Sequence, residues 1–221
     1  MTKTLETVNF REHDLPGRLI VVDGTDGVGK TTMLELVAEE LEQRKLPLVR
    51  TRQPTTEARE LDAFKVFLFE PERREEIDYR ALLCMMIGDR LQHIHQVVLP
   101  GLRAGKVVLC DRYIYTQMVT TRTRGFDDEP WMYELYDHVL RPDLALLFDA
   151  PLDVACDRIQ SRSDWRESFL ERDHVERNLL EYRRMASLFG MSVVDTSDAD
   201  PQVAFAKIRS ELDTALSGLG D

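Results

Sequence analysis

The sequence predicts an α/β fold in which a parallel sheet of five strands carries helices on both faces. Apolar runs of strand length alternate with helical patterns along the chain, which is typical of such a three-layer sandwich. The first apolar run, residues 18–23, leads through a glycine-rich loop into a helical pattern. With 221 residues, of which 43% are hydrophobic, the chain fits one domain, or one domain with a lid.

The elements are predicted in order along the chain. Residues 1–17 are polar and mixed in charge, so we expect a flexible, frayed arm before a domain at 18–221. Pro100-Gly101 is expected to end a long helix, and residues 71–78 to form a solvated link. Strands are predicted at 18–23, 48–51, 106–110, 144–149 and 191–195. Helices are predicted at 29–44, 57–69, 79–99, 114–123, 130–140, 151–160 and 202–216, and one more helix is predicted to end near residue 189.

The loop at residues 24–32 fits the pattern G-x-x-x-x-G-K-[ST]. Its place between a strand and a helix favours a phosphate-binding loop, because glycines let backbone N–H groups face a phosphate and the helix adds its positive end. We expect Lys30 to reach the β- and γ-phosphates and the Thr31 hydroxyl to bind Mg²⁺. The residues predicted to hold the nucleotide are Gly24, Thr25, Asp26, Gly27, Val28, Gly29, Lys30, Thr31 and Thr32.

A second group of candidates follows the apolar strand at 106–110. Asp111 is placed to bind Mg²⁺ at the carboxyl end of that strand, although an aspartate there is also a common helix cap. Arg112 suits an acceptor that is itself anionic, whereas water-using motor ATPases usually have Glu at this position. The base-reading N-K-x-D pattern of GTPases is absent, since neither Asn9 nor Asn178 precedes a lysine.

Arg158, Arg162 and Arg166 are spaced by four residues, which places them on one helical face if the helix continues that far. Acidic residues between them also allow a solvated surface of ion pairs, the interpretation that we prefer for residues 172–184. For 158–166, beside a predicted lid at about 158–170, we favour neutralisation of charge in a phosphoryl-transfer transition state.

Composition argues against several other functions. A net charge of −11 disfavours binding to a nucleic-acid polymer or to a membrane surface. No segment approaches the roughly 18 apolar residues that span a membrane, and no targeting pattern is present, so we expect a cytoplasmic protein. The phosphate-binding loop indicates small-molecule nucleotides as its partners. Cys84, Cys110 and Cys156 are widely spaced and are expected to be buried reduced thiols.

These motifs in this order resemble the thymidylate kinases, a family of P-loop nucleoside-monophosphate kinases. The resemblance covers residues 18 to about 195 and implies a P-loop kinase sandwich with a lid, ATP and Mg²⁺ as cofactors, and transfer of phosphate to dTMP. It also favours a homodimer. The matching stretches are GTDGVGKTT (24–32), TRQP (51–54), GDRLQH (88–93), AGKVVLCDRY (104–113), RPDLALLFDAP (141–151) and the lid-like 158–169.

The long helix at 79–99 agrees with a homodimer, because it offers more apolar surface than a one-sided helix needs. The alternative is that these residues fill a two-sided core. They are Leu82, Met85, Met86, Gly88, Leu91 and Val97.

The resemblance assigns roles to individual residues. Arg112 would hold the acceptor phosphate and Arg90 the base edge, while Asp26 together with Arg162 and Arg166 looks like the bacterial arrangement in which lid arginines assist transfer. Arg158 is assigned to the cofactor. The remaining residues assigned to the acceptor are Arg52, Gln53, Lys65, Met86, Gln117 and Thr120.

The acceptor residues depart from the family pattern. Met86 stands where the family has an aromatic residue that stacks on thymine. Thr120 stands where the family has an aromatic residue that crowds the 2′ position of the sugar. We therefore expect a weaker preference for dTMP over dUMP or a modified or ribo analogue. Lys65 stands where the family has an arginine.

Two other functions are considered. A deoxynucleoside kinase would need a carboxylate base where the chain has Gln53, so a monophosphate acceptor is favoured. A catalytically weak nucleotide-binding protein is the third hypothesis, against which Lys30, Asp111 and Arg112 argue.

Overall fold

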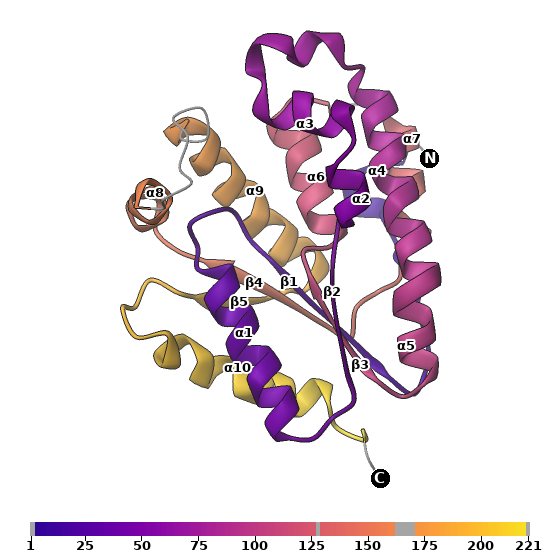
Figure 1. Cartoon of the computed structure of the whole chain (residues 1–221), viewed down its shortest axis with the longest axis vertical. Helices are drawn as coiled ribbons and strands as arrows, with labels where there is room; N and C mark the ends of the chain where they lie inside the picture. Colours follow the sequence, from indigo (N-terminus) through magenta and orange to yellow (C-terminus); the bar gives the residue numbers. More distant parts are fainter. Residues whose placement is uncertain (1–2, 127–128, 162–170, 220–221) are drawn as a thin grey trace.

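The computed structural model describes residues 3–126, 129–161 and 171–219. A parallel sheet with the strand order β2-β3-β1-β4-β5 lies at its centre, which confirms the predicted α/β fold (Figure 1). Each strand begins and ends within one residue of its predicted position. The strands are β1 (Arg18–Asp23), β2 (Leu48–Arg52), β3 (Val107–Asp111), β4 (Leu144–Asp149) and β5 (Ser192–Asp195).

Helices connect the strands and cover both faces of the sheet. They are α1 (Lys30–Gln43), α2 (Thr56–Arg59), α3 (Asp62–Phe69), α4 (Tyr79–His93), α5 (Leu99–Arg103), α6 (Ile114–Thr123), α7 (Pro130–Tyr136), α8 (Leu152–Gln160), α9 (Arg172–Phe189) and α10 (Pro201–Ala215). Short 3₁₀ helices lie at Leu5–Thr7 and Pro71–Glu76, and a π-helical turn at Ile94–Val98.

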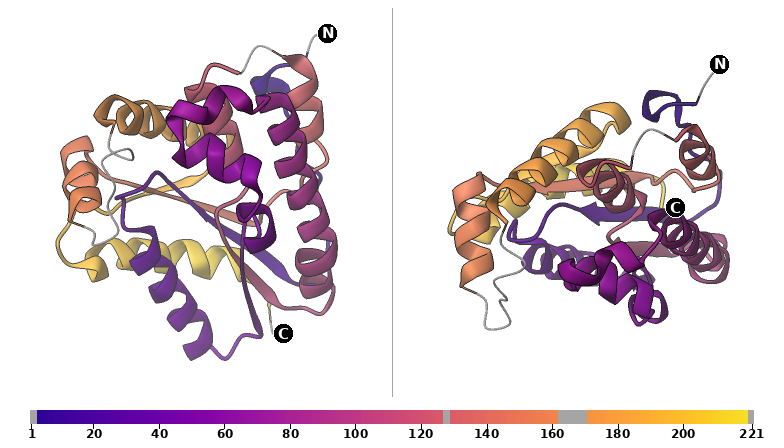
Figure 2. Two further views of the ribbon diagram at one scale, coloured as in Figure 1. Left: turned by 45° about the horizontal axis from the view of Figure 1, so that its top comes forward. Right: turned by 90° about the horizontal axis from the view of Figure 1, so that it is seen from above.

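Two hydrophobic cores lie on opposite faces of the sheet because successive strand residues point to opposite sides. In β1, Leu19 and Val21 join the core under α4, α6 and α7, whereas Ile20 and Val22 join the core under α1, α8 and α10. Helices α1 and α10 lie side by side over the second core (Figure 2). Burial on both faces explains why β1 is almost entirely apolar.

The amino-terminal arm differs from the prediction. Residues 3–17 pack on the domain instead of fraying: Leu5 and Phe10 are both buried, and the Phe10 ring stacks on Phe189 at 5.0 Å between centroids. The Arg11 N–H donates to the carbonyl of Val139 at 2.8 Å. Leu5, Val8, Phe10 and Leu15 all pack on the core, although these scattered apolar residues form no periodic pattern in the sequence.

Three predicted helices have different bounds. The helix predicted at 130–140 ends at Tyr136. The segment predicted as one helix at 57–69 breaks at residues 60–61 into α2 and α3. The helix predicted to end at Pro100 continues to Arg103, because the π-helical turn shifts the hydrogen-bond register just before Pro100, which then lies in the first turn of α5. Cys84 lies on the outer face of α4 and is exposed, contrary to the prediction, whereas Cys110 and Cys156 are buried.

Candidate active site

The phosphate loop joins the carboxyl end of β1 to the first turn of α1. A Cβ on Gly27 would lie 2.2 Å from the carbonyl oxygen of Ala155, and one on Gly24 would lie 2.5 Å from that of Phe148. Both residues also have positive φ angles, so only glycine fits. The loop therefore packs closely on α8 and β4 with its backbone turned as an anion-binding loop requires.

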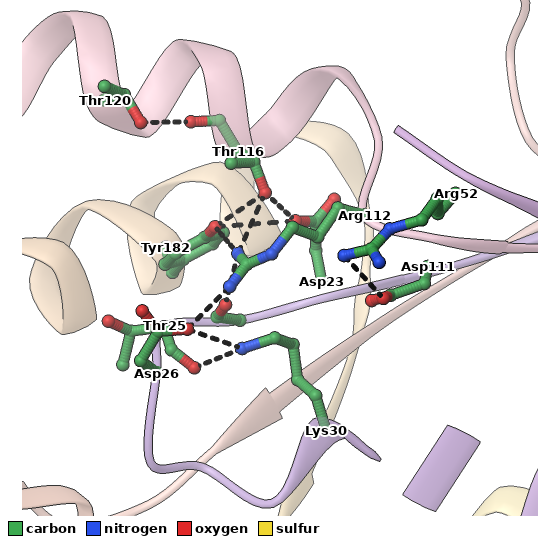
Figure 3. A network of polar contacts seen from close by, with 11 residues as sticks. Asp23, Thr25, Asp26, Lys30, Arg52, Asp111, Arg112, Thr116, Thr120 and Tyr182 are labelled. Carbon is green, nitrogen blue, oxygen red and sulfur yellow. Dashed lines mark hydrogen bonds and ion pairs between the residues drawn. The ribbon is translucent and has the colours of Figure 1, made fainter. Parts of the chain in front are cut away.

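Lys30 is the first residue of α1, and its side chain is only 11% exposed. Its ammonium group donates to the carbonyl of Thr25 and lies 3.6 Å from the Asp26 carboxylate (Figure 3). Burial, assisted by the nearby Arg112 cation, lowers the pKa of Lys30 to about 8. An anionic phosphate would reverse this effect, so the lysine is poised for a negatively charged ligand.

Arg112 follows β3 and has a left-handed backbone, with φ = 63°. Parallel pairing of β1 and β3 aligns Val22 with Asp111, which brings Arg112 next to the phosphate loop. Its guanidinium donates to the Gly24 carbonyl at 3.1 Å and to the Asp26 carboxylate at 2.7 Å (Figure 3). Burial opposes ionisation, but the surrounding carboxylates outweigh it and raise the pKa of Arg112.

A buried network holds the backbone beside Arg112. The Asp23 carboxylate, fully buried at the end of β1, accepts a hydrogen bond from the Tyr113 N–H at 2.9 Å. It also accepts one from the Thr116 hydroxyl (Figure 3). Thr116 in turn lies 2.9 Å from the Tyr182 hydroxyl of α9. Burial raises the pKa of Asp23 to about 6, against the opposing effect of these hydrogen bonds. Asp23 was not among the predicted site residues.

A pocket of about 320 Å³ opens beside the phosphate loop between α3, α4, α6 and α9. Its lining includes the polar and charged residues Thr25, Asp26, Arg59 and Arg112. It also includes four residues that were predicted to contact the acceptor: Met86, Arg90, Gln117 and Thr120.

Arg59 takes the position that was predicted for Lys65. It donates to the Pro54 carbonyl at 3.1 Å, and burial lowers its pKa to about 10, helped by the cations Arg52 and Arg112. Lys65 does not line the pocket; it pairs with Glu60 on the surface. Lys65 was assigned from the family resemblance alone, and the structure places Arg59 rather than Lys65 in the pocket lining.

Two further candidates do not reach the pocket. Gln53 is fully buried and its amide hydrogen-bonds the Nδ1 of His93 at 3.0 Å. Arg52 lies 4.0 Å from Asp111, and both border a separate cavity beyond the carboxyl end of β3. Within the described residues no three His, Cys, Asp or Glu side chains gather as a metal site.

Arg158 of α8 lies next to the phosphate loop. Its guanidinium donates to the carbonyl of Thr196 at 2.9 Å and borders a cavity of about 180 Å³ together with Gly29 and Thr32. Arg162 and Arg166, and most of the predicted lid, lie outside the described residues. Within the ranges that the structure describes, no helix is both long and apolar enough to cross a membrane.

Comparison with known proteins agrees with the geometry. Residues 22–205 match the family model described as thymidylate kinase. The "Probable thymidylate kinase" of Pyrococcus abyssi (strain GE5 / Orsay) is 34% identical over 176 residues, which cover 78% of this chain and 84% of that protein. The "Probable thymidylate kinase" of Thermococcus kodakarensis (strain ATCC BAA-918 / JCM 12380 / KOD1) is 31% identical, and the match covers 89% of this chain and 98% of that protein. The "Thymidylate kinase" of Chromohalobacter salexigens is 35% identical, and the match covers 73% of this chain and 74% of that protein.

Proposed function

The chain belongs to the thymidylate kinase family, and on this premise we propose that it transfers the γ-phosphate of ATP to a pyrimidine nucleoside monophosphate, with dTMP preferred and dTDP as product. The position of Arg112 carries the proposal. Its guanidinium is 2.7 Å from Asp26 of the phosphate loop and also lines the acceptor pocket. One cation therefore borders both the transferred phosphoryl group and the acceptor phosphate.

Such an acceptor needs no general base. The second pKa of a phosphate monoester is about 6, so the attacking oxygen is ionised at neutral pH. Catalysis then consists of alignment and neutralisation of charge, which we assign to Lys30 beside the phosphate loop and to Arg59 and Arg112 in the pocket lining. We assign a further share of this neutralisation to Arg162 and Arg166 of the lid.

ATP is assigned to the phosphate loop, with Arg158 and its cavity on the nucleoside side. Thr31 and Asp111 would hold Mg²⁺, because hydroxyl and carboxylate oxygens are the hard donors that this ion prefers, together with oxygens from substrate phosphates. When bound, the ion neutralises charge on the β- and γ-phosphates. Removal of Mg²⁺ by EDTA should therefore abolish turnover, and added Mg²⁺ should restore it.

The orientation of Gln53 supports a monophosphate acceptor over a nucleoside acceptor. Its amide is engaged by His93 and does not line the pocket, so it neither takes a proton nor approaches a neutral hydroxyl there. A deoxynucleoside kinase would need a base at that point. Cationic residues such as Arg59 in the same region suit a dianion instead.

Thr120 supports a relaxed preference at the sugar. Its hydroxyl donates to the Thr116 carbonyl at 2.9 Å, which leaves its oxygen free to accept a hydrogen bond from a 2′-hydroxyl. We propose that UMP is accepted within about tenfold of dUMP, measured as kcat/KM. Thr120→Tyr should lower turnover of UMP much more than that of dUMP; an equal loss for both would contradict this assignment.

The experiment that tests the function is a coupled assay with ATP and a panel of monophosphates: dTMP, dUMP, UMP, dCMP and dAMP. We expect dTMP to give the highest kcat/KM, with a preference over dUMP well below a thousandfold because Met86 replaces an aromatic ring. Lys30→Ala is the control for contaminating kinases. Absence of turnover with every pyrimidine monophosphate would refute the proposal.

We also propose a homodimer. Met85 is 40% exposed, and it lies with Cys84 and Gly88 on the outer face of α4, where small and apolar side chains leave room for a second helix. Leu82 and Met86, which were counted toward the apolar surface available for the dimer, are instead buried in the core. Light scattering at micromolar concentration should give twice the mass of the chain, about 51 kDa from 25.6 kDa. A mass of one chain would contradict the dimer.

A further inference from the structure

We propose that Tyr79 and Thr121 fix the orientation of the Gln117 side-chain amide, so that its oxygen faces the acceptor pocket and selects a base with an N–H at position 3. Uracil and thymine carry that donor, whereas cytosine has an acceptor there. The inference rests on the proposed function, because it concerns the acceptor of that same pocket. It makes Tyr79 and Thr121 positioning residues, which act on the substrate only through Gln117.

Three hydrogen bonds form a closed chain among these residues. The Thr121 hydroxyl lies 2.9 Å from the Gln117 backbone carbonyl, one helical turn earlier in α6. The Tyr79 hydroxyl lies 2.6 Å from the Thr121 hydroxyl, and the Gln117 side-chain amide lies 3.1 Å from the Tyr79 hydroxyl. The first residue of α4 thus connects to two consecutive turns of α6.

The number of protons allows only one direction for this chain. A carbonyl only accepts, so Thr121 uses its single proton on the Gln117 carbonyl. Thr121 must then accept from Tyr79, and Tyr79, having used its own proton, must accept from Gln117. Only the NH₂ end of the amide donates, so the Gln117 nitrogen faces Tyr79. Its oxygen is left for the pocket that Gln117 lines.

Burial keeps this arrangement in place. Tyr79, Thr121 and Gln117 are 4%, 2% and 6% exposed, so water has little access to compete for their hydrogen bonds. The Tyr79 ring stacks on Phe126 with centroids 4.1 Å apart and an interplanar angle of 16°. Burial also raises the pKa of Tyr79 to about 12, so the phenol keeps its proton throughout the neutral range.

The neighbouring Arg90 completes a pattern that matches one type of base. Arg90 is 1% exposed, and its Nη1 donates to the Met86 carbonyl at 3.0 Å. Its Nε has no hydrogen-bond partner in the described part of the chain. The pocket wall thus has donors on Arg90 and an acceptor on Gln117. Uracil offers the complementary carbonyl and N–H, while cytosine offers an amine and a ring nitrogen acceptor, which oppose both groups.

Two variants separate orientation from simple loss of a contact. Tyr79→Phe removes the partner of the amide nitrogen, so the amide is free to turn. Thr121→Val removes the acceptor for the Tyr79 proton, which then donates to the Gln117 oxygen and turns the amide nitrogen toward the base. Thr123→Val is the matched control, since the Thr123 hydroxyl makes the same bond to a carbonyl four residues earlier, at 2.9 Å, outside this chain of bonds.

The measured quantity is the ratio of kcat/KM for dUMP to that for dCMP. We expect at least about a hundredfold preference for dUMP in the unmodified protein. Tyr79→Phe should lower the ratio about tenfold, mainly through the KM for dUMP. Thr121→Val should lower it by at least about a further tenfold, whereas Thr121→Ser and Thr123→Val should retain it. The KM for ATP should not change.

An unchanged ratio in Thr121→Val would overturn the inference, as would an equal loss for both acceptors, because a merely structural role affects all acceptors alike. Calorimetric binding of dUMP and dCMP gives the same ratio without turnover. A protein that binds dUMP selectively and transfers no phosphate would therefore refute the proposed function while supporting the orientation of Gln117. Equal binding of both nucleotides by the unmodified protein would refute the orientation itself.

Discussion

Replacing the buried Asp23 by asparagine should change how stability depends on pH. Burial raises the pKa of Asp23 from 3.8 to about 6, so the folded protein holds this proton more tightly than the unfolded chain does. The stability contributed by the group is therefore full below pH 4 and is lost as pH rises through 6. At 1.36 kcal/mol for each pKa unit, the loss is about 3 kcal/mol, roughly half of it between pH 5 and 8.

The assay is urea denaturation of the unmodified protein and Asp23→Asn between pH 5 and 8. The unmodified protein should lose about 1–2 kcal/mol of unfolding free energy relative to the variant over this range. The asparagine side chain keeps only one of two acceptor oxygens, so the variant should also bind the acceptor less tightly because the backbone of Arg112 is less firmly held. Asp14→Asn, at an exposed position, is the control. If the difference in unfolding free energy between Asp23→Asn and the unmodified protein stayed constant from pH 5 to 8, the reasoning would be refuted.

Three further predictions follow from the site and the arm. Arg59→Ala should raise the KM for the acceptor at least about tenfold, while Lys65→Ala on the surface should leave it unchanged, as measured by steady-state kinetics. Lys30→Ala and Arg112→Ala should each lower kcat/KM by at least about a hundredfold and still unfold cooperatively in urea, because both act on phosphate charge; near-normal kinetics would contradict their roles. Phe10→Ala should lower the unfolding free energy by about 3–5 kcal/mol, against at most about 0.5 kcal/mol for Leu180→Ala at a 57% exposed position; equal values would mean that the arm is not anchored.

The sheet and the phosphate loop were predictable because their signals are local. A strand buried on both faces must be an unbroken apolar run, as in β1 and β4, and few loops other than a phosphate-binding one combine this glycine spacing with Lys30. Arg112 and Arg90 were predicted from short motifs, and the structure places both in the lining of one pocket. These parts needed no knowledge of how distant segments meet.

The errors arose where tertiary packing decides. Arg59 lines the pocket whereas Lys65 pairs with Glu60 on the surface, and the sequence of this segment alone does not show which of the two faces inward. The Phe10 ring of the arm stacks on Phe189 at the end of α9, and a contact between residues so far apart in the sequence leaves no periodic pattern. The bond from Tyr79 to Gln117 likewise joins residues 38 apart and is invisible in either helix alone.

The most direct test of the central claim compares dTMP with thymidine as acceptors of phosphate from ATP. We expect rapid transfer to dTMP and kcat/KM for thymidine at least about a thousandfold lower, because we assign Arg112 and Arg59 to an anionic acceptor, and because Gln53, at the place where a nucleoside kinase would need its base, is held by His93 outside the pocket. Arg112→Ala should narrow this ratio, because it should weaken the reaction of dTMP more than the reaction of thymidine. Comparable turnover of thymidine and dTMP would contradict the assignment of Arg112 to the acceptor phosphate.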